Sequence, residues 1–153
     1  MQYIKGQEEK LPSSEEGVLQ PQVKFKVCPV NASLGVLGKK WTILIIREIG
    51  VRRIERFNRL LEAIPGLTPR VLSTRLKELE KEELIECIEE KKSPMMVRWR
   101  LTEKGKDTLP ILMQLVAFGS KWYSHIVFED KKPRKLHEIF PQPEAREMIM
   151  SYL

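Results

Sequence analysis

The chain has 153 residues, of which 42% are hydrophobic and 31% charged, and its formal net charge at neutral pH is +6. This length corresponds to one domain with a short segment at either end, and the composition is typical of a folded, soluble protein. The longest aliphatic run, residues 43–46, is too short for a transmembrane helix, and the first residues lack the apolar stretch of a signal peptide. With only Cys28 and Cys87, no disulfide framework is expected. We therefore expect an intracellular protein without a membrane partner.

The basic residues are concentrated in two blocks that flank an acidic one. Residues 38–77 contain ten basic and three acidic residues, residues 78–90 one and seven, and residues 91–106 six and one. Such segregation indicates a surface that faces a polyanion. A basic helix face and a basic loop that bind nothing would give the same pattern, so on charge alone both interpretations stay open.

Apolar periodicity predicts two short helices behind a polar N-terminal segment. Residues 1–27 show no periodicity, and we expect them to form a mobile arm. Pro29 fits the first position of a helix that Gly38 ends. A second helical pattern runs from Trp41 to about Gly50.

The next two helices are separated by a tight turn. Apolar residues at helical spacing predict a helix over residues 57–64, which a proline and a glycine at 65–66 end. Thr68 as cap, followed by a proline at the first helical position, predicts another helix over residues 69–79. Two helices joined in this way form a helix-turn-helix.

The rest of the chain completes a recognisable architecture. Two runs rich in β-type residues predict a hairpin over residues 84–101. Thr102 is expected to start a long helix that continues past Trp122 and is kinked by Pro110. The predicted fold is therefore mainly α with a small β-hairpin (α+β), a winged helix-turn-helix over residues 28–127. Residues 128–153 form an extension in which residues 144–152 are compatible with a short amphipathic helix.

The helix over residues 69–79 carries residue types that read DNA. The face opposite its apolar stripe presents Arg70, Ser73, Thr74 and Lys77 at helical spacing. These side chains reach base edges and phosphates. We predict that this helix enters the major groove, with Thr68 at its N-terminus and Arg75 on its flank against the backbone. The alternative is a solvated face that carries basic residues for solubility.

The wing and the preceding helix add predicted contacts to the DNA backbone or the minor groove. They are Lys91 and Lys92 at the tip of the hairpin, Arg98 and Arg100 on its returning strand, and Arg56 and Arg59 at the third helix. Alternation along the returning strand places the two arginines on one face and apolar residues on the core face. Arg52 and Arg53 are interpreted as solvated.

No pattern in the sequence indicates an enzyme or a cofactor. The two histidines, His125 and His137, have no metal-ligand spacing, and no glycine-rich phosphate loop is present. The larger aromatic residues fit the core or a dimer interface, although a ligand pocket among them stays open: Trp41, Phe57, Phe118 and Trp122. A second hypothesis is a winged-helix module that binds a protein partner and never contacts DNA.

The chain from residue 28 to about residue 125 resembles the HxlR-type family of winged-helix transcription regulators. The matching stretches are residues 28–29, 37–41 (LGKKW), 45–49, 56–60, 64–80 (IPGLTPRVLSTRLKELE) and 97–105, in the family's order and spacing. The resemblance implies a cytoplasmic homodimer that binds a near-palindromic operator in double-stranded DNA. It also implies that the N-terminal segment and the helices after the wing build the dimer.

The chain departs from the family pattern at two glycine positions. Lys39 stands where a second glycine usually precedes lysine and tryptophan, and Glu83 stands where a glycine normally follows the recognition helix. A residue other than glycine at position 83 predicts either a strained left-handed conformation or a different helix end.

Cys28 has two interpretations. It precedes Pro29 at the start of the first helix, where a thiolate is favoured, and some members of the family have a redox-sensing cysteine at this position. Cysteine is also among the most buried residue types and often serves as a small hydrophobe. Cys87, in a predicted wing strand, is interpreted in this second way.

Overall fold

The computed structural model describes residue 19 and residues 21–90 and 96–150 of the chain. Its first half consists of α1 (Pro29–Leu37), α2 (Thr42–Gly50), α3 (Phe57–Ala63) and α4 (Pro69–Lys81). A proline occupies the first helical position of both α1 and α4, as predicted. The side chain of Thr68 caps α4, because its oxygen accepts a hydrogen bond from the backbone N–H of Val71 at 3.3 Å. The predicted N-terminal arm falls mostly outside the described residues.

Helices α3 and α4 form the predicted helix-turn-helix. The turn between them contains Gly66, whose φ of +83° lies in the left-handed region that favours glycine. Apolar residues of α4 (Leu72, Leu76 and Leu79) enter a core that also contains residues of α2, α3 and the wing. The opposite side of α4 therefore faces away from the core.

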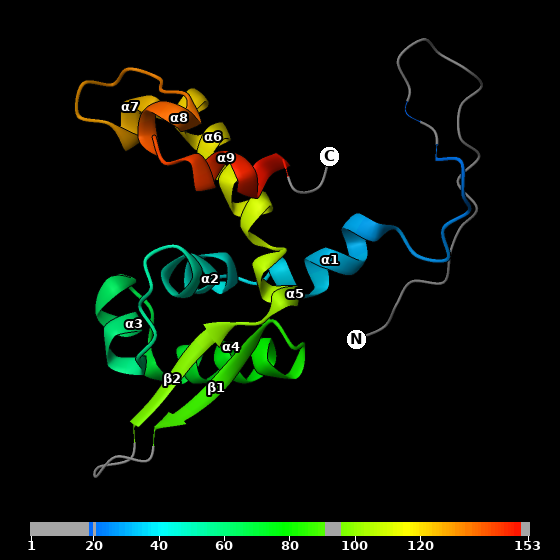
Figure 1. Cartoon of the computed structure of the whole chain (residues 1–153), viewed down its shortest axis with the longest axis vertical. Helices are drawn as coiled ribbons and strands as arrows, with labels where there is room; N and C mark the ends of the chain where they lie inside the picture. The colour runs from blue at the N-terminus through cyan, green and yellow to red at the C-terminus, as the bar shows by residue number, and fades with distance from the viewer. Residues whose placement is uncertain (1–18, 20, 91–95, 151–153) are drawn as a thin grey trace.

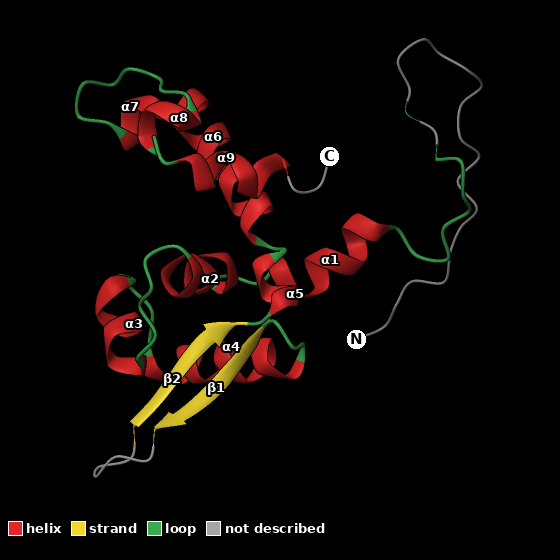
Figure 2. Cartoon of the chain, in the orientation of Figure 1, coloured by secondary structure: helices red, strands yellow, loops and turns green. Residues whose placement is uncertain are grey.

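The wing is an antiparallel hairpin of β1 (Ile85–Glu90) and β2 (Met96–Leu101), drawn as yellow arrows in Figure 2. Its register places Glu86 opposite Arg100. The loop before α3 lies along β2, where the backbone N–H of Trp99 donates to the carbonyl of Glu55 at 2.9 Å. The predicted tip residues Lys91 and Lys92 lie outside the described residues.

Helix α4 ends in a Schellman motif with glutamate in place of glycine. Glu83 has φ +58°, its N–H donates to the carbonyl of Glu80, and the N–H of Leu84 donates to the carbonyl of Leu79, both at 2.9 Å. Leu79 and Leu84 are buried together in the core. Of the two possibilities predicted for position 83, the structure shows the left-handed residue.

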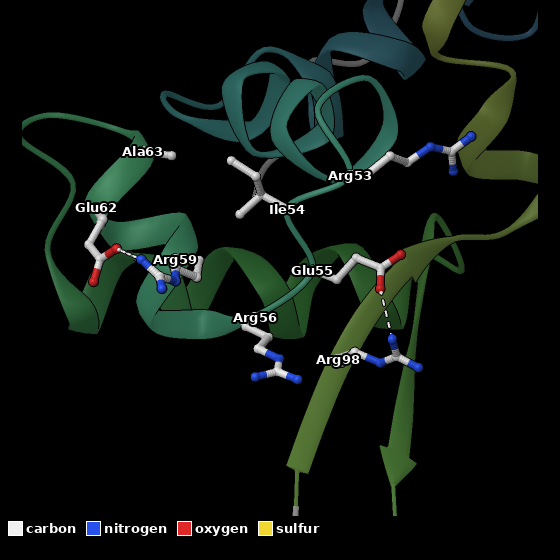
Figure 3. A pocket seen from close by; sticks show the side chains of 8 residues that line it. All are labelled: Arg53, Ile54, Glu55, Arg56, Arg59, Glu62, Ala63 and Arg98. Carbon is white, nitrogen blue, oxygen red and sulfur yellow. Dashed lines mark hydrogen bonds and ion pairs between the residues drawn. The ribbon is translucent and has the colours of Figure 1, made fainter.

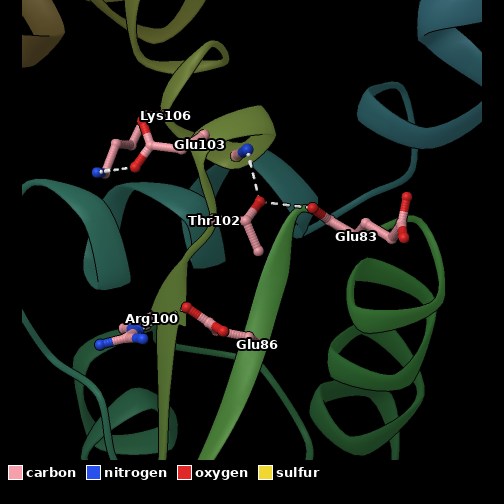
Figure 4. A network of polar contacts seen from close by, with 7 residues as sticks. Glu83, Glu86, Arg100, Thr102, Glu103 and Lys106 are labelled. Atoms are coloured by element: carbon pink, nitrogen blue, oxygen red, sulfur yellow. Dashed lines mark hydrogen bonds and ion pairs between the residues drawn. The ribbon is translucent and has the colours of Figure 1, made fainter.

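The base of the wing is tied to this helix end (Figure 4). The hydroxyl of Thr102 donates to the carbonyl of Glu83 at 2.5 Å and accepts a hydrogen bond from the N–H of Gly105 at 3.0 Å. The ammonium of Lys104 donates to the carbonyl of Glu82 at 2.6 Å. A Cβ at Gly105 would lie 1.9 Å from the carbonyl oxygen of Leu84, so only glycine fits there.

Our prediction of a single long helix after the wing is wrong. The structure has a short α5 (Glu103–Lys106) and a separate α6 (Leu109–Trp122). Pro110 lies in the first turn of α6 and does not kink it, because a proline in the first turn removes no helical hydrogen bond. The break is stabilised at Thr108, whose hydroxyl donates to the carbonyl of Gly105 at 2.6 Å.

The C-terminal extension folds back onto α6. After the short α7 (Ser124–Val127), which directly follows α6, the extension contains α8 (Leu136–Ile139) and α9 (Pro143–Met150), and these helices lie beside α6 in Figure 1. Both α8 and α9 contact α6. The predicted terminal helix over residues 144–152 thus corresponds to α9 as far as Met150, and the residues beyond lie outside the described part.

The predicted fold class is confirmed: the structure is mainly helical with a two-stranded antiparallel sheet, a winged helix-turn-helix. Within the described residues, no helix combines the length and apolar character needed to cross a bilayer.

Candidate nucleic-acid interface

The outer face of α4 carries the predicted DNA-reading side chains. Arg70, Thr74 and Lys77 are exposed, and Ser73 between them is half-buried. The hydroxyl of Thr74 donates to the carbonyl of Arg70 at 2.9 Å and keeps its lone pairs for a further donor. The capping Thr68 is also exposed. The structure therefore gathers these residues on one accessible face, as the helical spacing predicts.

Arg75 has a different environment from the one we expected on the flank of this helix. Its Nε donates to the backbone carbonyl of Lys40 at 3.0 Å, and its Nη1 donates to Glu78 at 2.9 Å. The guanidinium is thus half-buried and makes both of these hydrogen bonds within the fold.

A hollow lined by arginines lies between the loop before α3 and the wing (Figure 3). Its volume is about 530 Å³, and its charged lining consists of Arg53, Arg56, Arg59, Arg98, Glu55 and Glu62. Three of these arginines, Arg56, Arg59 and Arg98, are predicted backbone contacts, and Arg53 is the one interpreted as solvated. Arg53, which has a left-handed backbone at φ +57° in the segment between α2 and α3, also lines the hollow.

The arginines of this region differ in what they contact. Arg52 binds the fully buried carboxylate of Glu48 at 2.9 Å and supports α2. Arg59 pairs with Glu62 at 2.9 Å, with both side chains largely exposed, an arrangement that contributes little to stability.

The two wing arginines each pair with a carboxylate. Arg98 lies 3.6 Å from Glu55, as the dashed line in Figure 3 shows, and Arg100 lies 2.6 Å from Glu86. They share one face of β2, as alternation predicts. Because part of their charge is neutralised by Glu55 and Glu86, their attraction to phosphates is weaker than that of unpaired arginines.

The two cysteines are both exposed. Cys28 is the N-cap residue of α1, as predicted. The interpretation of Cys87 as a buried hydrophobe is wrong, because its side chain is exposed, although the register places it opposite Trp99 on the same face of the wing as the buried Ile85. Partial burial, followed by the negative charges of Glu80 and Glu89, raises the pKa of the Cys87 thiol, which disfavours the reactive thiolate.

The aromatic residues do not share one environment. Phe57 packs against Trp99 with ring centroids 6.4 Å apart, and Phe118 packs against Tyr123 at 6.0 Å. In the part of the chain that is described, no group of three or more histidine, cysteine, aspartate or glutamate side chains is arranged to hold a metal ion.

The capped recognition helix, the wing and the arginine-lined hollow together define a winged helix-turn-helix DNA-binding protein. Residues 36–127 match the model of the HxlR-like helix-turn-helix family, and the chain belongs to that family.

Several similar proteins are named as transcription regulators. YvaP of Bacillus subtilis, an HTH-type transcriptional regulator, is 34% identical over 98 residues, which span 63% of this chain and 90% of YvaP. The reduced form of the B. subtilis regulator YodB is 32% identical with a TM-score of 0.54, covering 63% of this chain and 94% of YodB. The redox regulator HypR in its oxidized form is 31% identical with a TM-score of 0.56, covering 60% and 94%. This chain is thus a DNA-binding transcription regulator.

Proposed function

We propose that the protein acts in the cytoplasm as a homodimer that binds a near-palindromic operator and controls transcription. Helix α4 enters the major groove, and the wing lies on the backbone or in the minor groove. The observation that carries this proposal is the exposed face of α4, where Arg70, Thr74 and Lys77 point away from the core on a helix whose other side is buried. Because the buried side of α4 already fixes its backbone, binding in a groove requires ordering of the exposed side chains only.

The arginine-lined hollow supports a second part of this proposal, which is a contact to the DNA backbone. Its four arginines outnumber its two glutamates. Arg53 and Arg56 are exposed and make no ion pair with the described residues. Cations in such a position release counterions from DNA and supply affinity that does not depend on sequence.

Two unpartnered apolar stripes support the homodimer. Along α6, four large side chains recur at helical spacing and are each 46% to 61% exposed: Ile111, Leu115, Phe118 and Trp122. On α1, no residue is buried, and Val30 and Leu34 are 66% and 55% exposed. Contiguous apolar surface of this kind marks an interface. A second copy of the chain is the partner implied by the two-fold symmetry of a palindromic operator.

Selection from a random pool of duplexes with the full-length protein tests the proposal. We expect a two-fold symmetric sequence with half-sites about one helical turn, or a multiple, apart. Binding to the selected site should weaken steeply with salt. If no duplex is enriched and none is retarded in a gel at low salt, the alternative of a protein-interaction module replaces this function.

A redox response at Cys28 is a second proposal, and it is favoured by the exposure of this thiol at the N-cap of α1. Oxidation there would alter the helix that we assign to the dimer interface. We expect a mild oxidant to change operator affinity in the wild type and in Cys87→Ser, and to leave Cys28→Ser unchanged. The same response in all three proteins would show that Cys28 is not a sensor.

A further inference from the structure

A network of ionic contacts joins the turn between α1 and α2 to the recognition helix. Lys39 lies 3.0 Å from Glu78 of α4. Arg75, one turn earlier on α4, binds the same glutamate at 2.9 Å and donates to the carbonyl of Lys40 at 3.0 Å. The two ends of this network are 35 residues apart in the chain. We call these contacts of Lys39, Lys40, Arg75 and Glu78 the latch.

The charges in the latch reinforce one another. Partial burial alone would raise the pKa of the Glu78 carboxyl, but the hydrogen bond from Lys39 and the positive charge of Arg75 outweigh it and lower that pKa. Glu78 is therefore ionised at neutral pH and is held from both sides.

The turn that the latch holds has an unfavourable backbone conformation. Trp41, the N-cap of α2, has φ +79°, in the left-handed region that large side chains rarely adopt. Such a residue persists only where its surroundings fix it. The bond from Arg75 to the preceding carbonyl is one contact that does so, and the packing of the Trp41 ring near Gly66 is another.

Apolar packing does not fix the direction of α1. No residue of α1 is buried, and only Val36 and Leu37 in its last turn pack partly against the core. A crevice of about 210 Å³, lined among others by Gly35, Glu78 and Glu82, separates this last turn from α4. In Figure 1, α1 points away from the body formed by α2, α3, α4 and the sheet.

We propose that the latch sets the spacing of operator half-sites, with Arg75 and Glu78 acting as positioning residues and not as DNA contacts. The inference rests on the proposed dimer, in which α1 lies at the interface. The angle between α1 and α4 then fixes the distance and rotation between the two recognition helices.

Glu78→Gln tests the latch with a matched control, Glu80→Gln. Both changes remove one negative charge from α4, but Glu80 is exposed and its carboxylate makes no hydrogen bond or ion pair with the described residues. Charge alone predicts that both variants bind every duplex more tightly, because each loses a group that repels phosphates. The latch predicts that Glu78→Gln, unlike Glu80→Gln, changes how the protein discriminates between spacings.

The assay uses the operator selected by the wild type and versions with one or two base pairs added or removed between the half-sites. We expect the wild type and Glu80→Gln to lose on the order of tenfold in affinity at a wrong spacing, and Glu78→Gln to lose less than about threefold. Arg75→Lys keeps the charge but cannot make both bonds, and it should behave like Glu78→Gln. Equal spacing discrimination in all four proteins would overturn the proposal.

Amide hydrogen exchange of the free protein separates this proposal from the proposed function. In Glu78→Gln, exchange across α1 and the following turn should be about three- to tenfold faster than in Glu80→Gln, because the latch opens more often. Identical exchange would disprove the latch, whether or not the protein binds DNA. Faster exchange without any selected operator would leave the latch standing, and would overturn both the proposed function and the role in half-site spacing.

Discussion

Replacing Glu83 by glycine should stabilise the protein. Position 83 has φ +58°, a conformation that costs a non-glycine residue about 1–2 kcal/mol relative to glycine. Glycine has more conformational freedom in the unfolded chain, and this offsets about 0.4–1 kcal/mol of the stabilisation gained by relieving that strain. Removing a negative charge from the C-terminal end of α4 adds about 0.3 kcal/mol at an exposed site. The expected net increase in the free energy of unfolding is about 1 kcal/mol.

The structure offers little that the substitution would remove. The carboxylate of Glu83 makes no hydrogen bond or ion pair with the described residues, and the carbonyl that accepts the Thr102 hydroxyl belongs to the backbone and is retained. The two hydrogen bonds of the Schellman motif are also backbone bonds. They should form more readily with glycine at position 83.

Urea denaturation and thermal unfolding followed by circular dichroism measure this effect. We expect a rise in Tm of about 2–4 °C for Glu83→Gly, since a chain of this size shifts by about that amount per kcal/mol. Glu83→Gln removes the charge but keeps the Cβ. Its Tm should therefore rise by less than about a third of the increase expected for Glu83→Gly. Equal stabilisation by the two variants would assign the effect to charge, and a destabilised Glu83→Gly would refute the left-handed conformation at this position.

Four further outcomes are expected. Thr74→Ala should weaken binding to the selected operator by about 1–3 kcal/mol more than binding to random DNA. Arg56→Gln should weaken binding to both DNAs alike and lower the slope of log affinity against log salt concentration by about one; fluorescence anisotropy measures both effects. Trp122→Glu should shift the protein from dimer to monomer in light scattering, because it places a charge on the apolar stripe of α6. Gly105→Ala should destabilise the fold in urea denaturation, since its Cβ would lie 1.9 Å from a carbonyl oxygen. The stability difference between the wild type and Glu78→Gln should be present at neutral pH and should disappear as acid brings the pH through the lowered pKa of Glu78, because protonation breaks its ion pairs.

Local patterns in the sequence were enough to predict the elements of the DNA-binding unit. The helix start at Thr68 and Pro69, the turn at Gly66 and the alternation along β2 are signals carried by residues a few positions apart. Local geometry fixes such signals before any tertiary contact is made. For that reason the recognition helix and its exposed face could be predicted with their boundaries nearly correct.

Short-range signals were insufficient where the outcome depends on a neighbour distant in sequence. Pro110 is compatible both with a kink and with a helix start, and the Thr108 hydroxyl bond and the packing of α6 decided for the start. Cys87 shares a face of the wing with the buried Ile85, but the cover over that face comes from elements distant in sequence and leaves Cys87 exposed.

Only the tertiary structure showed the environment of the charged side chains. Arg75 has the same helical spacing to the DNA-reading face whether it binds a phosphate or the carbonyl of Lys40, so the sequence could not distinguish the two. Lys39 and Glu78 meet because packing of the core brings the turn after α1 against α4. Arg53, with its left-handed backbone, also lines the arginine-lined hollow, and no local pattern predicts this. The partner of a long, charged side chain depends on which groups the fold places within its reach, and spacing along the sequence does not specify those groups.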